Sequence, residues 1–503
     1  MKPGTVYLIG AGPGDPGLLT LRGRDLLAAC DAVVYDYLAN SALLAHVRPD
    51  AELIYVGKRG GDHTLPQPEI SRLLVRLAKE GKSVARLKGG DPYIFGRGAE
   101  EAEEILDAGL DFEVVPGVSS ALGASAYAGI PLTHRAYSSS VCFATGHEDP
   151  TKPESAHDWN ALAKGGSTLV FFMGVKNLPI IVENLMRAGL DGATPAALVC
   201  WGSTPRQRSL ATTLAELPAK AVEHEFKAPS LIIIGKVAAL RQKLAWFEKK
   251  PLLGKGVLVT RSREQASSIV AMLGDLGAET FEFPSIRVEP CEDYSPLREA
   301  LCCLHTYDWI LFTSVNTVSF FWKQMAMLGL DSRALSMCRI AAVGPATSSA
   351  LAAKGIIADF IPGVFTADDI LKGLLAQGMK DMRILMPGAL ERATVLPEGL
   401  RAAGADVSEV TAYVTKPETE NAGLLFDMLN AGRIHVVSFA SSSAVKGFLR
   451  RIPPEILCRY PNLRYACIGP VTARTLTDAG LECHIMPAEH TIPALVEAIA
   501  AGA

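Results

Sequence analysis

Short apolar stretches rich in β-branched residues alternate with amphipathic stretches through residues 5–240. This rhythm is typical of βα units, in which the strands of a mostly parallel sheet are buried on both faces. The expected strands are residues 5–10, 32–36, 83–91, 112–117, 167–174, 196–202 and 230–235. Most of them end in glycine or aspartate, and open α/β sheets bind ligands at the carboxyl ends of their strands. The pattern therefore predicts a site built from the loops that follow these strands.

The pattern changes at residues 241–256, where a cationic run, one proline and two glycines interrupt the alternation. Such a composition indicates a linker. We accordingly expect a first domain at 1–242, a linker at 243–256 and a second domain at 257–503.

The second domain contains an internal repeat. The segment around Gly344 aligns without a gap with the segment around Gly469, and the turn at 312–318 corresponds to the turn at 439–445. Two similar α/β lobes are therefore expected, with a cleft between them that is lined by backbone amides and hydroxyls at helix N-termini. Such a cleft would suit carboxylates. The same serines and threonines are also explained as N-caps of the following helices, and the two roles are compatible.

The composition describes a packed protein with more than one core. A chain of 503 residues, with 49% hydrophobic and 20% charged residues, is too long for one core and too apolar for disorder. The net charge of −4 provides no overall field that would hold nucleic acid. An anionic ligand would therefore need a local cluster of cations.

The ten cysteines include no C-x-x-C pair, so the sequence supports neither a metal site nor a disulfide framework. We expect buried thiols in a reducing compartment. The longest apolar runs have the length of strands, and glycine, proline and aspartate follow the first of them, so neither a membrane span nor a signal peptide is expected. These features favour a cytoplasmic protein without a nucleic-acid or membrane partner.

A glycine-rich turn follows the first strand and resembles a dinucleotide fingerprint, with Asp36 at the position of the ribose-binding acid. Two features argue against nicotinamide or flavin. Pro13 and Pro16 lie where a helix would offer free N–H groups, and Asp15 replaces the third glycine beside the phosphates.

Longer motifs are more specific. The segments RLKGGDPYIFGRG at 86–98 and AYAGIPLTHR at 126–135 occur with several others in a characteristic order, and residues 3–245 resemble the uroporphyrinogen-III C-methyltransferases of the tetrapyrrole methylase superfamily. The resemblance implies a two-lobed α/β fold, with lobes at about 1–115 and 116–242. It implies transfer of methyl groups from S-adenosylmethionine to two ring carbons of uroporphyrinogen III, giving precorrin-2 without a metal. It also implies a homodimer formed through this half.

The resemblance further implies site residues. Asp36 and Lys58 would be the catalytic pair, although a surface ion pair is the alternative for them. The implied cofactor-binding residues are Pro13, Gly89, Gly90, Asp91, Ile94, Ser119, Ser120, Met173 and Gly202. Tight turns would also explain the glycines, and ordinary core packing would explain Met173.

The substrate of that family carries eight carboxylates, which arginine forks bind well. The cations in or beside the strand-end loops are Lys58, Arg59, Lys88, Arg97, His134, Arg135, Arg206 and Arg208. Each of them alone could be a solvated surface charge, so the prediction concerns the cluster.

Residues 257–500 are similar to the uroporphyrinogen-III synthases through the segment 257–265, the repeated turns and the segment TAYVTKP at 411–417. That family implies a two-lobed fold with strand exchange, here 257–289 with 418–503 and 290–417 as the other lobe. Tyr413 would be the acid that protonates the departing hydroxyl of hydroxymethylbilane, unless it is a packed strand aromatic. The implied carboxylate cradle comprises Arg261, Thr313, Ser314, Ser441, Ser442, Gly469 and Thr472.

Together the two resemblances predict one bifunctional enzyme on the route to sirohaem and cobalamin, because the product of the second half is the substrate of the first. Two alternatives remain: a chain active only as a methyltransferase, and a tetrapyrrole-binding protein without activity. A precorrin-2 dehydrogenase would need a further Rossmann domain, which is not expected.

Overall fold

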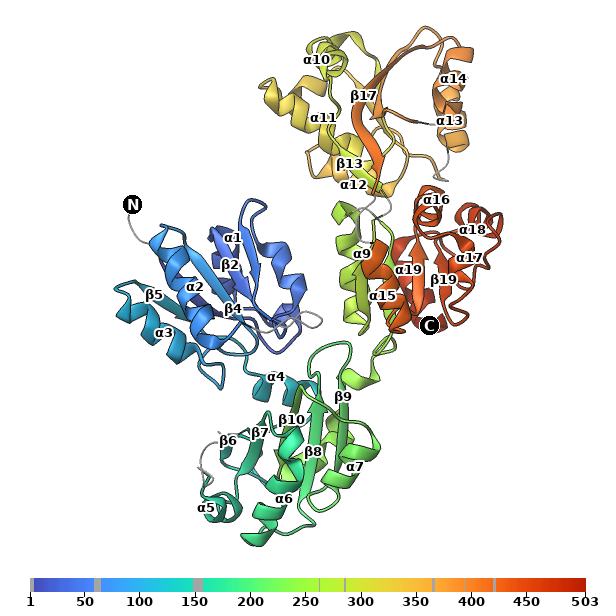
Figure 1. Ribbon diagram of the computed structural model, residues 1–503. Coiled ribbons are helices and arrows are strands. Elements are labelled where there is room, and N and C mark those ends of the chain that lie inside the picture. The colour runs from blue at the N-terminus through green and yellow to red at the C-terminus, as the bar shows by residue number, and fades with distance from the viewer. Residues whose placement is uncertain are drawn as a thin grey trace.

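The computed structural model describes residues 4–57, 65–147, 157–261, 263–284, 286–363, 367–392, 394–418 and 422–503. These residues form four α/β lobes, each built on one β-sheet (Figure 1). Two lobes precede residue 241 and two follow residue 255. No helix in the described ranges has the length and hydropathy that a membrane crossing requires.

The first lobe has a parallel sheet in the order β3-β2-β4-β1-β5. Its strands are β1 (Val6–Gly10), β2 (Ala32–Tyr35), β3 (Glu52–Tyr55), β4 (Val84–Lys88) and β5 (Phe112–Val115), and its helices are α1 (Leu21–Ala29), α2 (Gln67–Lys79) and α3 (Gly98–Asp107). The central strands β1 and β4 are almost fully buried, as expected for a parallel sheet covered on both faces. Their carboxyl ends meet at one edge.

The second lobe corrects the expectation of a mostly parallel sheet. Its order is β6-β7-β10-β8-β9, and only β6 and β7 pair in parallel. One reason is the short connection 201–207 between β8 and β9, because a parallel crossover needs a dozen residues or more. The strands are β6 (Val141–Thr145), β7 (Thr168–Phe172), β8 (Pro195–Cys200), β9 (Arg208–Thr213) and β10 (Ser230–Ile234). The helices are α4 (Ser120–Tyr127), α5 (Trp159–Lys164), α6 (Leu178–Arg187) and α7 (Leu217–Glu223).

The third lobe combines strands from the two ends of the second half. Its parallel sheet has the order β12-β11-β18-β19. The strands are β11 (Gly256–Val259), β12 (Glu279–Glu282), β18 (Val436–Phe439) and β19 (Arg464–Cys467), and the main helices are α9 (Arg263–Asp275), α15 (Ala422–Asn430), α16 (Ser442–Arg451), α18 (Pro470–Thr477) and α19 (Ile492–Gly502). The chain thus leaves this lobe after β12 and returns for β18.

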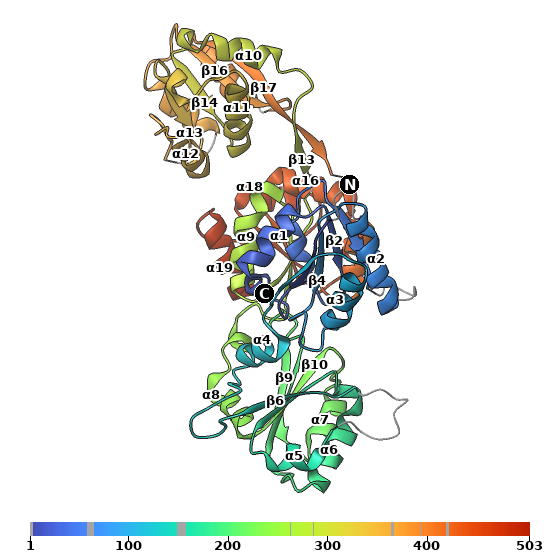
Figure 2. The same cartoon turned by 90° about the vertical axis from the view of Figure 1, so that its left-hand side faces the viewer.

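The fourth lobe lies between these two passages and has the sheet order β13-β17-β16-β14-β15. The strands are β13 (Ile286–Glu289), β14 (Trp309–Phe312), β15 (Arg339–Ala342), β16 (Arg383–Ala389) and β17 (Asp406–Pro417), and the helices are α10 (Ser295–Cys302), α11 (Val315–Met327), α12 (Pro345–Ala352), α13 (Ala367–Leu375) and α14 (Val395–Ala402). β13 pairs antiparallel with β17, so residues 286–289 belong to this lobe. This corrects the sequence-based expectation, which assigned them to the third lobe. In Figure 2 these two strands form a narrow ribbon between the lobes.

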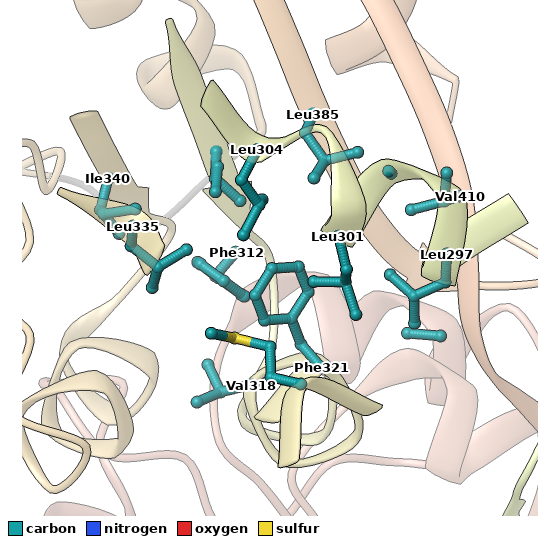
Figure 3. Packing of buried hydrophobic residues seen from close by; sticks show 14 of the residues in the cluster. Leu297, Leu301, Leu304, Phe312, Val318, Phe321, Leu335, Ile340, Leu385 and Val410 are labelled. Atoms are coloured by element: carbon teal, nitrogen blue, oxygen red, sulfur yellow. The ribbon is translucent and has the colours of Figure 1, made fainter. Parts of the chain in front are cut away.

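The core of the fourth lobe gathers around Phe321 of α11, which is fully buried (Figure 3). The ring of Phe321 meets the ring of Phe312 edge-on, with centroids 5.1 Å apart. Aliphatic side chains of α10 and of neighbouring strands surround both rings, including Leu301 and Leu385. This packing fixes the start of α11 against the carboxyl end of β14.

The internal repeat corresponds to equivalent strand-to-helix turns. Gly344 and Gly469 are the N-cap residues of α12 and α18. Ser314 and Ser441 are the N-caps of α11 and α16, and each serine Oγ accepts a hydrogen bond from a backbone N–H three residues later. The capping role predicted for these two serines is therefore confirmed, and it leaves a ligand role open.

Candidate active sites

Three glycines bring backbone segments of the first lobe into direct contact. A Cβ on Gly117 would lie 2.3 Å from the carbonyl oxygen of Gly90, and a Cβ on Gly10 would lie 2.5 Å from Gly117 Cα. Gly90 also exchanges backbone hydrogen bonds with Gly12, at 2.7 and 3.2 Å, and has φ +70°. A Cβ at Gly10 or Gly117 would displace the backbone, and the φ of Gly90 is one that residues with a side chain rarely adopt. The three glycines thus form a cradle without side chains at the ends of β1, β4 and β5.

The N-terminus of α4 lies beside this cradle. Gly90 approaches Ser120, since a Cβ on the glycine would be 3.6 Å from the serine N. Ser119 is the buried N-cap of α4. The two carboxylate oxygens of Asp91 accept hydrogen bonds from the N–H groups of Tyr93 (2.8 Å) and Gly117 (3.1 Å). The predicted residues Gly90, Asp91, Ser119 and Ser120 therefore lie together.

Two more of the predicted cofactor residues, Pro13 and Gly202, pack on α4. Pro13 packs on Gly123 of α4, where a Cβ would be 2.3 Å from the proline Cγ. A Cβ on Gly202 would lie 2.2 Å from the Cβ of Ala124, so Gly202 also packs directly on α4. In both views α4 lies between the first and second lobes (Figures 1 and 2), so it joins the loops of both sheets.

Two exposed apolar residues flank a contact between the two lobes. The rings of Phe95 and Phe172 are 4.9 Å apart, and their chain neighbours Ile94 and Met173 are 38% and 52% exposed. Met173 is therefore not a core-filling residue. Both side chains are accessible to a ligand at the edge where the lobes meet.

The loops of these two lobes also carry strained backbone, which the sequence did not indicate. Among the described non-glycine residues, seven have positive φ, and five of them are Phe95, Arg97, Met173, Trp201 and Ser203. Such conformations are costly, persist only when the surroundings enforce them, and concentrate at functional sites.

Asp36 belongs to an ion network beneath the cradle. Its Oδ2 accepts a 3.0 Å hydrogen bond from Arg86 Nη2, and its Oδ1 accepts one from the N–H of Leu38. Arg86 is almost fully buried on β4, where its Nε is also 3.3 Å from Glu101 Oε1. Leu38 is in contact with the backbone of Gly89, because a Cβ there would be 2.6 Å from the leucine Cβ. Asp36 is thus held at the edge of the same region.

Lys88 differs from its predicted role. Its ammonium is buried and donates a 2.7 Å hydrogen bond to Glu101 Oε1, which Gln67 also approaches at 2.8 Å. Burial, and then the charge of Arg86, lowers the pKa of Lys88. An ammonium committed to a buried carboxylate cannot act as a surface cation for substrate, so the structure contradicts that expectation. The sequence contained an indication of this role. Residues 86 and 88 are cations on one face of a strand predicted to be buried, and buried cations require an anionic partner nearby.

The other predicted cations fall into three groups. Lys58 and Arg59 lie outside the described residues. Arg97, His134 and Arg135 are exposed, and Arg97 pairs with Glu100 at 2.5 Å. Arg206 lies over the Trp201 ring, and Arg208 donates to the carbonyl of His224 and so faces the end of α7.

An open groove of about 710 Å³ between α2 and α3 contains none of the predicted residues. Basic side chains of α2 and acidic side chains of α3 line it, including Arg72, Arg76, Glu104 and Asp107. Such mixed charge is typical of solvated helix faces, and we assign it no ligand.

In the second half, Tyr413 and Ser314 come together. Tyr413 lies on β17, is 8% exposed and has its hydroxyl 3.2 Å from Ser314 Oγ. Its ring stacks on Phe320, with centroids 5.7 Å apart. The hydroxyl of Ser314 is also 2.9 Å from Thr317 Oγ1, so three hydroxyls meet at the start of α11, next to Thr313.

The rest of the predicted cradle lies in the third lobe. Ser441, Ser442, Gly469 and Thr472 follow the adjacent strands β18 and β19, and Ser442 accepts a hydrogen bond from Thr475 of α18. Arg261 follows β11, and burial lowers its pKa. Within the described ranges, no hydrogen bond or ion pair joins these residues to Thr313, Ser314 or Tyr413. The structure thus divides the predicted cradle between two lobes.

Comparisons with known proteins agree with this organisation. Residues 5–218 match a family described as Tetrapyrrole (Corrin/Porphyrin) Methylases, and residues 267–497 match one described as Uroporphyrinogen-III synthase HemD. The chain is 37% identical to a porphyrin biosynthesis protein HemD of Ruminiclostridium josui over 99% of this chain and 98% of that protein. It is 40% identical to a uroporphyrinogen-III C-methyltransferase of Bacillus subtilis, over 71% of this chain and 73% of the relative.

A siroheme synthase of Pseudomonas putida is 56% identical over 49% of this chain, and the chain spans about half of its length, 52%. The matches define a fusion of two α/β enzymes of tetrapyrrole synthesis. The chain belongs to the family that joins an N-terminal tetrapyrrole methylase domain, here a uroporphyrinogen-III C-methyltransferase, to a C-terminal uroporphyrinogen-III synthase domain.

Proposed function

We propose that the first half transfers methyl groups from S-adenosylmethionine to two ring carbons of uroporphyrinogen III and yields precorrin-2. The observation that carries this proposal is the glycine cradle of Gly10, Gly90 and Gly117 beside the N-terminus of α4. It lets a ligand reach backbone N–H and carbonyl groups closely, and the strained loops around it are typical of a binding site.

The residues present fit this cofactor. Gly89, Gly90 and Asp91 would hold its polar end together with Ser119 and Ser120. The accessible Ile94 and Met173 would contact its apolar parts and its sulfur, for which a thioether is a polarizable partner. Pro13 and Gly202 would close the site from either side of α4. S-adenosylmethionine supplies a methyl group that is activated by a sulfonium centre.

The protein's own contribution is positioning, since a displacement at a methyl carbon requires a near-attack distance of about 3 to 3.5 Å and aligned partners. Asp36 would accept the proton that leaves the pyrrole, and Arg86 fixes the orientation of its carboxylate. Lys58 would be the second member of the catalytic pair with Asp36. Arg59, Arg97, His134, Arg135 and Arg206 would bind the substrate carboxylates.

The test is methylation of uroporphyrinogen III followed by mass spectrometry. The wild type should add two methyl groups, and Asp36→Asn should lower kcat at least tenfold. Alanine at Arg97, His134 and Arg135 should raise KM for the tetrapyrrole and leave the affinity for S-adenosylmethionine unchanged. Equal loss of both affinities would contradict the assignment of these cations.

For the second half we propose cyclisation of hydroxymethylbilane with inversion of the last ring. Tyr413 would protonate the departing hydroxyl, and its contact with Ser314 supports a polar role for a side chain that is otherwise packed among apolar residues. Arg261 and the hydroxyls of both lobes would bind the bilane carboxylates.

Hydroxymethylbilane without S-adenosylmethionine provides the test of the second half. Formation of the type III isomer supports the proposal, and the type I isomer alone would mean that only the methyltransferase half is active. With S-adenosylmethionine present, precorrin-2 should form from the bilane, as needed for sirohaem and cobalamin synthesis.

We further propose a cytoplasmic homodimer. The ten cysteines are all free, which suits a reducing compartment. Leu21 and Leu122 are 70% and 54% exposed in the first half and could pack in an interface there. Analytical ultracentrifugation should give twice the mass of the chain, and Leu21→Glu should shift it to the monomer.

A further inference from the structure

The segment between the two halves is ordered and packed, in contrast to the linker that its composition predicts. It forms α8 (Arg241–Leu244) and a short turn at Phe247–Lys249. Phe247 is 4% exposed, and Leu252 is fully buried in the core of the third lobe. The proline and the two glycines of this segment therefore lie in a packed bend.

This segment contacts the end of α4 through its aromatic residues. The rings of Trp246 and Phe247 lie 5.1 and 4.8 Å from the ring of Tyr127, and Trp246 Nε1 donates to the carbonyl of Ala126 at 3.0 Å. The hydroxyl of Tyr127 donates a 2.6 Å hydrogen bond to Asp15. Burial, and then Asp15, raises the pKa of Tyr127, so the hydroxyl keeps its proton and remains a donor. The segment thereby supports the loop that contains Pro13.

The same segment supports the loop of Gly202 through Glu248. The carboxylate of Glu248 accepts a 3.0 Å hydrogen bond from Gln207 Nε2, and it also accepts from Ser209 and Arg241. Gln207 is 3% exposed, and its Oε1 accepts a 2.8 Å hydrogen bond from the N–H of Ser203. Glu248 therefore determines which end of the Gln207 amide faces the loop.

The loop needs such support because of its conformation. Trp201 and Ser203 have φ +51° and +61° on either side of Gly202, and non-glycine residues keep such angles only when neighbouring groups hold them. Ser203 Oγ in turn accepts a hydrogen bond from the N–H of Asp15 at 3.4 Å. The contacts thus run from Glu248 to both loops that flank α4.

We propose that Glu248 is a positioning residue for S-adenosylmethionine: through Gln207 it holds the Gly202 loop in its ligand-binding conformation from outside the methyltransferase lobes. The inference rests on the proposed use of S-adenosylmethionine by this half. The partners of Glu248 are Gln207, Ser209 and Arg241, and none of them is assigned to the cofactor, so loss of Glu248 should weaken cofactor binding and leave the chemical step intact.

The first experiment is calorimetric titration of the full chain with S-adenosylmethionine. Glu248→Ala should raise Kd at least tenfold, and Glu248→Gln, which keeps an acceptor for Gln207, should raise it no more than threefold. Glu223→Ala, an exposed carboxylate at the end of α7, is the matched control and should leave Kd unchanged. In Glu248→Ala, kcat at saturating cofactor and KM for the tetrapyrrole should stay within twofold of the wild type.

A second experiment separates positioning from general destabilisation. Gln207→Glu keeps an acceptor for Ser203 but places two carboxylates side by side, and it should raise Kd at least tenfold. Combining it with Glu248→Gln restores the hydrogen bond with donor and acceptor exchanged, and should return Kd to within threefold of the wild type. If Glu248→Ala fails to fold, the comparison of Gln207→Glu with the double variant still tests the positioning role of Glu248.

The outcomes are distinct. A wild-type chain that does not bind S-adenosylmethionine would refute the proposed function. If the wild type binds and Glu248→Ala binds equally well, or the double variant is as weak as Gln207→Glu alone, the role of Glu248 is refuted and the proposed function stands.

Discussion

Asp36 and Arg86 form an ion pair of 3.0 Å in which the arginine is 3% exposed and the aspartate 27%. The buried partner is fixed from below by Glu101, which is fully buried and shared with Lys88. The partly exposed carboxylate is therefore oriented from two sides, by Arg86 and by the N–H of Leu38 in its own loop. This arrangement explains why two cations occur on one face of β4.

We predict that Glu101→Gln destabilises the first lobe by about 3–5 kcal/mol, because removing one partner of a buried ionic cluster leaves the others uncompensated. Hydrogen exchange measured on peptides of β4 and α3 reports the local free energy of opening. Glu103→Gln, on the exposed face of the same helix, should change it by less than about 0.5 kcal/mol. Equal effects of the two variants would mean that the cluster adds no stability.

Tyr413→Phe should slow ring-inverted closure at least tenfold while the fold persists, because the stacked ring remains on Phe320 and only the hydroxyl beside Ser314 is lost. The rate of type III isomer formation and the melting temperature are the two readouts. Tyr307→Phe, a partly buried tyrosine of the same core, is the control. An unchanged rate in Tyr413→Phe would assign this residue to packing.

Phe321→Ala should cost about 3–5 kcal/mol in the fourth lobe, since it empties the centre of the core shown in Figure 3. Met327 lies on the same helix and is 63% exposed, so Met327→Ala should be nearly neutral. Synthase activity should fall in Phe321→Ala while methyl transfer is retained. Loss of both activities together would show that the two halves unfold as one unit.

The second half should lose stability below about pH 6.5. Burial, and then Lys255, lowers the pKa of His435 below its ordinary value of 6.5, and its Nδ1 accepts a hydrogen bond from the N–H of Gly256. The unfolded chain takes up a proton before the folded chain does, so this contribution is complete above pH 6.5 and is lost as the pH falls. Thermal unfolding at pH 7.5 and 5.5 should show the decrease, and it should be smaller in His435→Asn. If His435→Asn loses as much stability as the wild type, the pH dependence comes from titratable groups other than His435.

Residues that end strands were predictable from the sequence because glycines and capping serines mark them locally. Ser314 and Ser441 are N-caps as the pattern indicated, and the alignment of Gly344 with Gly469 identified equivalent turns. Local signals of this kind depend on backbone geometry that one or two residues determine.

Pairings between distant residues were not predictable in the same way. Nothing in the composition of 241–256 shows that Glu248 meets Gln207, or that Trp246 meets Tyr127. Basic, proline and glycine residues are common both in linkers and in tightly packed bends, so the pattern does not show how such a segment packs. The antiparallel direction of β10 was not predictable either, because it depends on which strands lie beside β10 in the sheet and not on the residues of β10 itself.

The packed bend between the halves determines where the chain can be divided. A cut at residue 242, which composition suggests, would separate the methylase from Trp246, Phe247 and Glu248, and one after Gly254 would remove Leu252 from the synthase core. A break after Glu248 and before Leu252 keeps these side chains with the half whose core they contact.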